Sequence, residues 1–259
     1  MDNKSQNIPS IKGENMSESG YDDFAWLYHK HWDDFTDRVW PVIQNFVLPY
    51  AAKGCHIVDL CCGTGKMARR LLDEGYWVTG IDNSQEMLQW AHQNASDATL
   101  LCQDAREFQL DQPAQVIVSL FDSLNHMMHI HDLQQVFSRV FEALVPGGLF
   151  FFDMNTVQKY ESRWASQNAL IYPDHVAALS AHYDLKTRIA SFDAAIFVKH
   201  QEAWIRRDVH LTQRAYAVNE IQQALVNAGF PEARILDGLQ DLSVSDFYGR
   251  LFFWTQKLS

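Results

Sequence analysis

The sequence lacks a long apolar run and is short of positive charge. No apolar stretch among its 259 residues approaches the ~18 consecutive residues that a membrane-spanning helix requires, so no membrane partner is expected. Lysine and arginine number 21 against 32 acidic residues, which gives a formal net charge of -11. Because such a charge repels a phosphate backbone, the composition argues against nucleic acid as a partner.

Cysteine is also scarce, and its spacing excludes the usual paired motifs. The four cysteines, Cys55, Cys61, Cys62 and Cys102, contain no C-x-x-C pair. This pattern predicts buried, reduced thiols in a cytoplasmic protein. Residues 1–20 have neither the apolar core of a secretory signal nor the arginine richness of a transit peptide, and we interpret them as a flexible tail.

Strand and helix patterns alternate from residue 55 onward, which favours parallel strands joined by crossover helices. The aromatic-rich residues 21–50 predict one or two helices, with Pro41 as a breaker. Apolar residues at helical spacing over 133–144 predict another helix, and Asn219 is expected to cap a last one. Only two strand candidates follow that last helix.

The alternation lapses over residues 155–217, where the pattern is that of β-hairpins or a meander. We interpret this segment as an insertion folded over the carboxyl ends of the main strands. A lid, a substrate subdomain and a dimer surface are all compatible with it, so a homodimer stays open.

A glycine turn joins the first predicted strand to a helix. Gly63 and Gly65 lie where the chain must turn sharply and let a ligand approach the backbone. Asp82 ends the second strand, 17 residues after Gly65, where a carboxylate can accept hydrogen bonds from ribose hydroxyls. A dinucleotide site shares these features, and Ala68 in place of the third glycine does not exclude it.

Further acidic residues separate the two interpretations. Asp59 lies inside the first strand, Asp82 begins an Asp-x-Ser-x-x-Met-Leu run, and the third strand ends before Asp104. Together these features resemble the class I S-adenosylmethionine (SAM) dependent methyltransferases. An oxidoreductase that uses NAD(P) leaves Asp59 and Asp104 unexplained, and no Tyr-x-x-x-Lys pair is present.

The resemblance covers residues 21–154 and 218–259 and implies one SAM-binding domain, with residues 155–217 inserted as a β-meander lid. It implies an α/β fold of the Rossmann-like, doubly wound type. The expected sheet has seven mostly parallel strands, of which the last is antiparallel.

The resemblance also assigns roles to residues at the strand ends. Asp59 would lie by the methionine part of SAM, Asp82 would hold the ribose, Met87 would cover the adenine and Asp104 would meet its amino group. Simpler structural roles remain for each, such as a strand-end cap for Asp59 or a turn former for Asp104. The full set of cofactor-binding residues expected is Asp59, Cys61, Gly63, Thr64, Gly65, Asp82, Asn83, Met87, Asp104, Ala105 and Phe121.

The loop after the fourth strand carries the candidate catalytic residue. His126 can act as a general base or orient the acceptor, and a helix-cap or packing role is the alternative. This loop and the aromatic entry Tyr-Asp-Asp-Phe-Ala-x-x-Tyr are similar to those of amino-sugar N,N-dimethyltransferases and, more distantly, glycine N-methyltransferase, which implies that Tyr28 approaches the acceptor with His126. Asn125 departs from the glycine that the sugar enzymes tend to have, so the resemblance does not transfer the substrate. Although His129 and His131 lie nearby, the sparse carboxylates lead us to expect no metal.

The sequence therefore predicts methyl transfer from SAM, with S-adenosylhomocysteine as product, to a nitrogen or oxygen of a small-molecule acceptor by in-line displacement. A SAM-binding protein without turnover is a further alternative, because a fold and a cofactor pocket do not establish chemistry.

Overall fold

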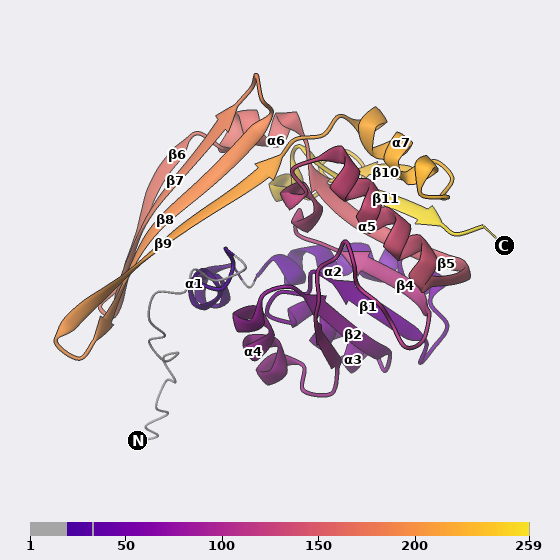
Figure 1. Ribbon diagram of the computed structural model, residues 1–259, viewed down its shortest axis with the longest axis horizontal. Helices are drawn as coiled ribbons and strands as arrows, with labels where there is room; N and C mark the ends of the chain where they lie inside the picture. Colours follow the sequence, from indigo (N-terminus) through magenta and orange to yellow (C-terminus); the bar gives the residue numbers. More distant parts are fainter. Residues whose placement is uncertain (1–19, 33, 259) are drawn as a thin grey trace.

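The computed structural model describes residues 20–32 and 34–258, so the expected tail lies, apart from Gly20, outside the described residues. The described chain forms two sheets, which are shown in Figure 1. The larger sheet has seven strands, and the smaller has four that follow one another along the chain.

The larger sheet has the predicted topology. β1 (His56–Leu60) pairs in parallel with β2 (Trp77–Asp82) and β4 (Ala114–Ser119). β11 (Arg250–Gln256) runs antiparallel to β5 (Leu144–Asn155) and β10 (Arg234–Asp237). This confirms the α/β, mostly parallel seven-stranded sheet. The strand order reverses between β1 and β4, the place where open α/β sheets leave a crevice beyond the carboxyl ends of their strands. In spatial order the strands are β10 (Arg234–Asp237), β11 (Arg250–Gln256), β5 (Leu144–Asn155), β4 (Ala114–Ser119), β1 (His56–Leu60), β2 (Trp77–Asp82) and β3 (Thr99–Cys102).

Helices cover both faces of this sheet. Phe150 and Phe152 of β5 belong to the core on one face, and Leu149 and Phe151 belong to the core on the other. Because successive strand side chains point to opposite faces, an apolar run such as this one fits a strand buried on both sides. The first core includes α5 (Ile130–Ala143) and α7 (Val218–Asn227), and the second includes α2 (Phe35–Phe46) and α3 (Lys66–Asp73).

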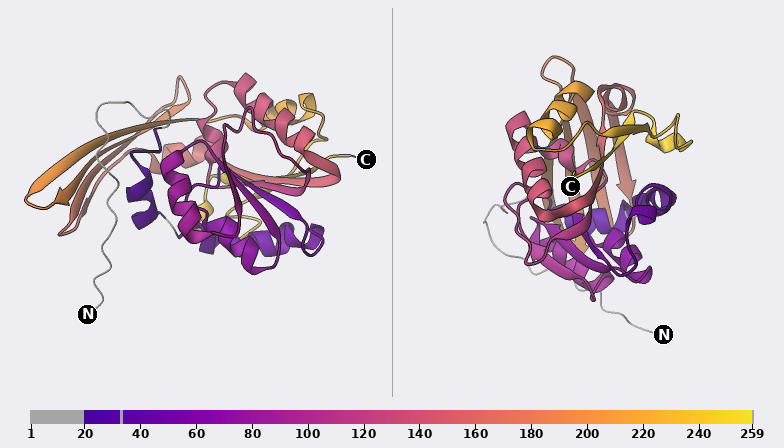
Figure 2. Two further views of the ribbon diagram at one scale, coloured as in Figure 1. Left: turned by 60° about the horizontal axis from the view of Figure 1, so that its bottom comes forward. Right: turned by 90° about the vertical axis from the view of Figure 1, so that its right-hand side faces the viewer.

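The smaller sheet is the expected antiparallel meander, and it projects from the rest of the molecule as a long arm (Figure 2). Helix α1 (Ala25–His31) packs against it, where Leu27 joins a buried cluster with Ala194, Ile196 and Val209. At its end, β9 leads the chain back to the larger sheet. The elements are α1 (Ala25–His31), α6 (Val157–Arg163), β6 (Ser166–Ile171), β7 (His175–Asp184), β8 (Ile189–His200) and β9 (Ala203–Arg214).

Three local expectations are wrong. Pro41 lies inside α2 rather than ending it. The cap of α7 is Ala217, not Asn219, because the Glu220 carboxylate reaches back to accept the Ala217 backbone N–H at 2.7 Å. Of the four cysteines expected to be buried, Cys62 is buried and Cys55 and Cys61 are half-buried. Cys102 is exposed, because β3 is the edge strand of the larger sheet. Within the described ranges, no helix is both long and apolar enough to cross a membrane.

Candidate functional site

A cavity of about 710 Å³ lies between the carboxyl ends of the main strands and the antiparallel sheet. The loops after β1, β2, β3 and β4 form its floor, and residues of α1, β8 and β9 form the opposite wall. The residues predicted from the sequence that line it are Tyr28, Asp59, Cys61, Gly63, Thr64, Asp82, Asn83, Met87, Asp104, Ala105, Phe121 and His126.

The two glycines of the first turn serve different purposes. Gly63 has a φ of +52°, and a Cβ built there would have no atom within 4 Å, so the backbone is open to a ligand. Gly65 does not line the cavity. A Cβ at Gly65 would lie 2.9 Å from the Cα of Ala91 on α4 (Gln85–Asn94), so this glycine permits close packing of the turn on a helix.

Asp82, at the end of β2, fixes the turn that follows β1 and the start of α4 by hydrogen bonds. Its Oδ2 accepts the Gly63 backbone N–H at 2.8 Å and its Oδ1 accepts the Ser84 N–H at 2.9 Å. Ser84 caps α4 and donates its hydroxyl to Asp22 at 2.5 Å. The segment before α1 is thereby attached beside Asp82, at one end of the cavity.

Burial changes the ionisation of the two floor carboxylates. It raises the pKa of Asp59 to about 7, and it raises that of Asp82 to about 6 despite hydrogen bonds from Ser84 and Gly63. Asp59 is only 3% exposed, and its Oδ2 has no hydrogen-bond partner among residues 20–32 and 34–258. A buried carboxylate in this condition favours a cationic or hydrogen-bond-donating ligand.

Asp104 is held by a neighbour. Arg106 donates to its two oxygens at 2.9 and 2.6 Å, and this hydrogen bonding lowers the pKa of Asp104. Asp104 therefore lines the cavity as a paired carboxylate, in contrast to Asp59.

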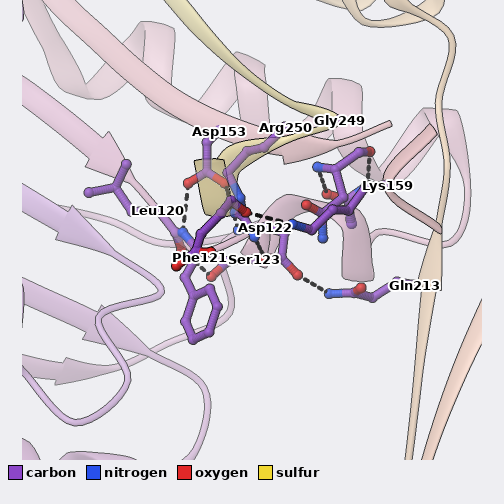
Figure 3. Close-up of polar contacts among 12 residues, drawn as sticks. Leu120, Phe121, Asp122, Ser123, Asp153, Lys159, Gln213, Gly249 and Arg250 are labelled. Carbon is purple, nitrogen blue, oxygen red and sulfur yellow. Dashed lines mark hydrogen bonds and ion pairs between the residues drawn. The ribbon is translucent and has the colours of Figure 1, made fainter. Parts of the chain in front are cut away.

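The loop after β4 is fixed by a buried ion cluster (Figure 3). Phe121 and Asp122 adopt left-handed conformations, with φ of 62° and 49°, which cost roughly 1–3 kcal/mol each in a non-glycine residue. The Asp153 carboxylate holds them there by accepting the backbone N–H of Phe121 at 2.6 Å and of Asp122 at 3.0 Å. Arg250 forms ion pairs with both Asp153 and Asp122.

His126, at the end of η2 (Ser123–His126), is held from two sides. Its Nδ1 lies 2.8 Å from the Thr212 carbonyl, and its Nε2 lies 2.8 Å from the Tyr21 hydroxyl and 3.1 Å from Gln213 Nε2. Since a carbonyl only accepts, Nδ1 carries the proton of the neutral ring and Nε2 presents a lone pair. Burial lowers the pKa of His126, although the charge of Asp122 opposes this.

The Tyr21 hydroxyl lies against His126, and the expected approach of Tyr28 to the acceptor stays a prediction. Tyr28 lines the cavity with its ring 5.8 Å from that of Phe121. The aromatic segment before α1 contains both tyrosines, and sequence spacing alone does not distinguish them. His131 does not join His126, because its side chain is 83% exposed.

Four further residues at the site were missed: Tyr21, Asp122, Gln213 and Arg250. Asp122 is next to the predicted Phe121, so its place in the loop was a usable signal. Gln213 lies 87 residues along the chain from His126, and Arg250 lies 128 residues from Asp122. Neither belongs to a local sequence motif that could have predicted its place in the site.

Comparisons with known proteins agree with this geometry. The family described as "Methyltransferase domain" matches residues 57–148. "Putative methyltransferase YqeM" of Bacillus subtilis (strain 168) is 32% identical over 251 residues, which cover 92% of this chain and 97% of that protein. A "dTDP-3-amino-3,4,6-trideoxy-alpha-D-glucopyranose N,N-dimethyltransferase" of Streptomyces venezuelae is 29% identical over 107 residues, 41% of this chain and 45% of that protein.

Among solved structures, the sugar N-methyltransferase KedS8 of Streptoalloteichus sp. ATCC 53650 has the same fold, with a TM-score of 0.74 at 15% identity. The match covers 98% of this chain and 99% of that one. Both the sequence similarity along nearly the whole chain and the site at the strand-order reversal point to one conclusion. This chain belongs to the class I SAM-dependent methyltransferases.

Proposed function

We propose that this protein transfers the methyl group of SAM to a nitrogen or oxygen of a small-molecule acceptor, with His126 as the group that takes the acceptor's proton. The observation that carries this proposal is the lone pair on His126 Nε2. This imidazole is neutral and lines the cavity. Its other nitrogen, Nδ1, donates its hydrogen to the Thr212 carbonyl.

The floor of the cavity fits SAM by the chemistry of its donors. Asp59 offers a buried carboxylate oxygen to the cationic methionyl end, and Gly63 leaves open space beside the backbone. Asp82, already fixed by Gly63 and Ser84, retains lone pairs for the ribose hydroxyls. When bound, SAM supplies a methyl group on a sulfonium that is a good leaving group.

The acceptor would occupy the half of the cavity nearer the antiparallel sheet. Phe192 and Leu211 of that sheet and Trp164 after α6 give it apolar walls, and Gln213 and Asn155 give it polar groups. A cavity of about 710 Å³ is of the size that holds small molecules, typically about 300–1,000 Å³. Two of the similar proteins are named as sugar N-methyltransferases, which supports nitrogen as the acceptor atom.

In the reaction, this chain's residues align the acceptor, exclude water and receive a proton. His126 Nε2 accepts the proton released as the new bond forms, either directly or across the Tyr21 hydroxyl that bridges it to the cavity. Burial raises the pKa of Tyr21, so its hydroxyl stays protonated and acts as a donor and bridge. Alignment contributes much of the rate, because the leaving group needs no activation.

Replacing His126 tests this role. His126→Ala should lower kcat by about a hundredfold to ten-thousandfold, the range of general-base catalysis, and leave the affinity for S-adenosylhomocysteine nearly unchanged. The matched control is His131→Ala, which removes an exposed imidazole five residues away. Formation of S-adenosylhomocysteine with a panel of small amines and alcohols is the readout. Full activity in His126→Ala would reject the base, and no turnover with any acceptor would favour a SAM-binding protein without catalysis.

A further inference from the structure

Gln213 lies between the Asp122 carboxylate, in the loop after β4, and the His126 imidazole. Its Nε2 is 2.6 Å from Asp122 Oδ2 and 3.1 Å from His126 Nε2, and its Oε1 accepts the Tyr160 hydroxyl at 3.0 Å. Figure 3 shows the amide directed at Asp122. Gln213 is 6% exposed, so these contacts are made away from solvent.

The orientation of this amide is dictated by its partners. Asp122 accepts hydrogen bonds only, because its Oδ1 is bound by the Arg250 guanidinium at 2.5 Å. The nitrogen of Gln213 must therefore face Asp122, and the oxygen must face Tyr160. One N–H satisfies Asp122, and the second N–H is directed at His126 Nε2.

Asp122 has no freedom to move away. Asp153 holds its backbone N–H, Arg250 holds its carboxylate, and Asp122 itself is 6% exposed. The Gln213 amide is therefore bound to a carboxylate that is held in place and carries a negative charge.

We propose that Gln213 is a positioning residue that keeps His126 neutral with its lone pair on Nε2, by standing as an uncharged donor between the imidazole and Asp122. A carboxylate in direct contact with an imidazole favours the imidazolium. An amide N–H in that place favours the neutral ring, since a protonated Nε2 would put two donors face to face. Thr212, the preceding residue of β9, completes the arrangement by accepting from Nδ1.

Groups from several elements face His126. Tyr21 approaches Nε2 from the segment before α1, Thr212 and Gln213 approach from β9, and Asp122 acts through Gln213 from the loop after β4. Of these, Gln213 is the group that decides whether the negative charge of Asp122 reaches the ring directly. The inference rests on the proposed function, in which His126 accepts the proton.

The test is a pH titration of His126 by NMR of ligand-free protein labelled with ¹⁵N-histidine, with His126→Ala used to assign its signal. In the wild type we expect the Nδ1–H tautomer and a pKa below about 6.5. Gln213→Glu puts an oxygen that can accept from Nε2–H in place of a donor, and it should raise the pKa of His126 by about one pH unit or more. Gln167→Glu is the matched control, because Gln167 is exposed on β6 and the variant adds the same charge.

A second variant covers the case in which Gln213→Glu does not fold. Gln213→Met keeps the length of the side chain and removes the donor, so the pKa of His126 should rise in the same direction by a smaller amount. An unchanged His126 titration in a folded Gln213 variant overturns the inference.

The pH dependence of kcat separates the two proposals. If His126 is the base, the acid limb of the profile should move with the NMR titration in Gln213→Glu and stay in place in Gln167→Glu. A shifted NMR titration with an unmoved acid limb would leave Gln213 in its role and remove His126 as the base.

Discussion

At the scale of single residues, the floor of the cavity is defined by carboxylates that are poorly solvated. Burial raises the pKa of Asp59 to about 7 and that of Asp82 to about 6, so both hold protons more tightly in the folded protein than in the unfolded chain. By linkage, the ligand-free protein loses stability as the pH rises from about 4 to about 7. A cationic ligand restores the stability of the folded protein by pairing with the ionised carboxylates.

This predicts a pH dependence of ligand binding at the proposed cofactor site. The affinity for S-adenosylhomocysteine, whose ammonium needs an ionised partner, should rise about tenfold between about pH 6 and pH 8 as Asp59 ionises. Asp59→Asn should bind S-adenosylhomocysteine more weakly at pH 8. Its affinity should still depend on pH, but over the lower pH range in which Asp82 ionises. Calorimetric titration at several pH values measures both. The same pH dependence in the wild type and in Asp59→Asn would contradict the role of Asp59.

The residues that the sequence could predict share a local origin. Asp59, Gly63 and Asp82 belong to a strand, the turn after it and the next strand, so short-range spacing was enough to find them. Tyr21 and Gln213 reach His126 from 105 and 87 residues away, and their positions depend on how the arm and the N-terminal segment fold over the cavity. The spacing of residues in the sequence does not predict that packing.

At the scale of elements, the loop between β4 and η2 depends on β5 and β11. Asp153 of β5 and Arg250 of β11 are 0% and 4% exposed, and together they hold two residues with left-handed backbones. Burial lowers the pKa of Arg250, but the charges of Asp153 and Asp122 outweigh it and leave the pKa raised. The guanidinium therefore remains charged at every pH at which the protein is folded.

Removing that charge should destabilise the fold. Arg250→Met leaves Asp153 and Asp122 buried without a counter-charge, which should cost about 3–5 kcal/mol in the free energy of unfolding. Urea denaturation measures this loss, and Arg206→Met, at a side chain 61% exposed, serves as the control. Equal stability of the two variants would show that the cluster does not support the loop.

Elements with strong periodicity were predicted best. The helix expected over residues 133–144 corresponds to α5, because it buries a long apolar stripe. The errors occurred where one side chain or one contact decides the local structure. Pro41 is accommodated within α2, and the Glu220 carboxylate makes Ala217 the N-cap of α7.

At the scale of the whole molecule, the cavity is assembled from two sheets and the segment before α2. The larger sheet contributes the carboxyl ends of parallel strands, and the arm contributes β8 and β9. Asp22 and Tyr21 then fasten the N-terminal segment to α4 and to His126. Methyl transfer needs such an enclosure, because alignment and exclusion of water contribute much of the rate.

The central claim is that this enclosed cavity is the SAM site and that Asp82 holds the ribose. Calorimetric titration of ligand-free protein with S-adenosylhomocysteine tests it most directly, with Asp82→Ala as the variant and Asp97→Ala, at a side chain 76% exposed, as the control. The account predicts binding to the wild type and the control. It predicts a dissociation constant at least roughly ten- to a hundredfold higher in folded Asp82→Ala, since the loss of even one charge-assisted hydrogen bond costs about 1.5–3 kcal/mol. The same dissociation constant in all three proteins would contradict it.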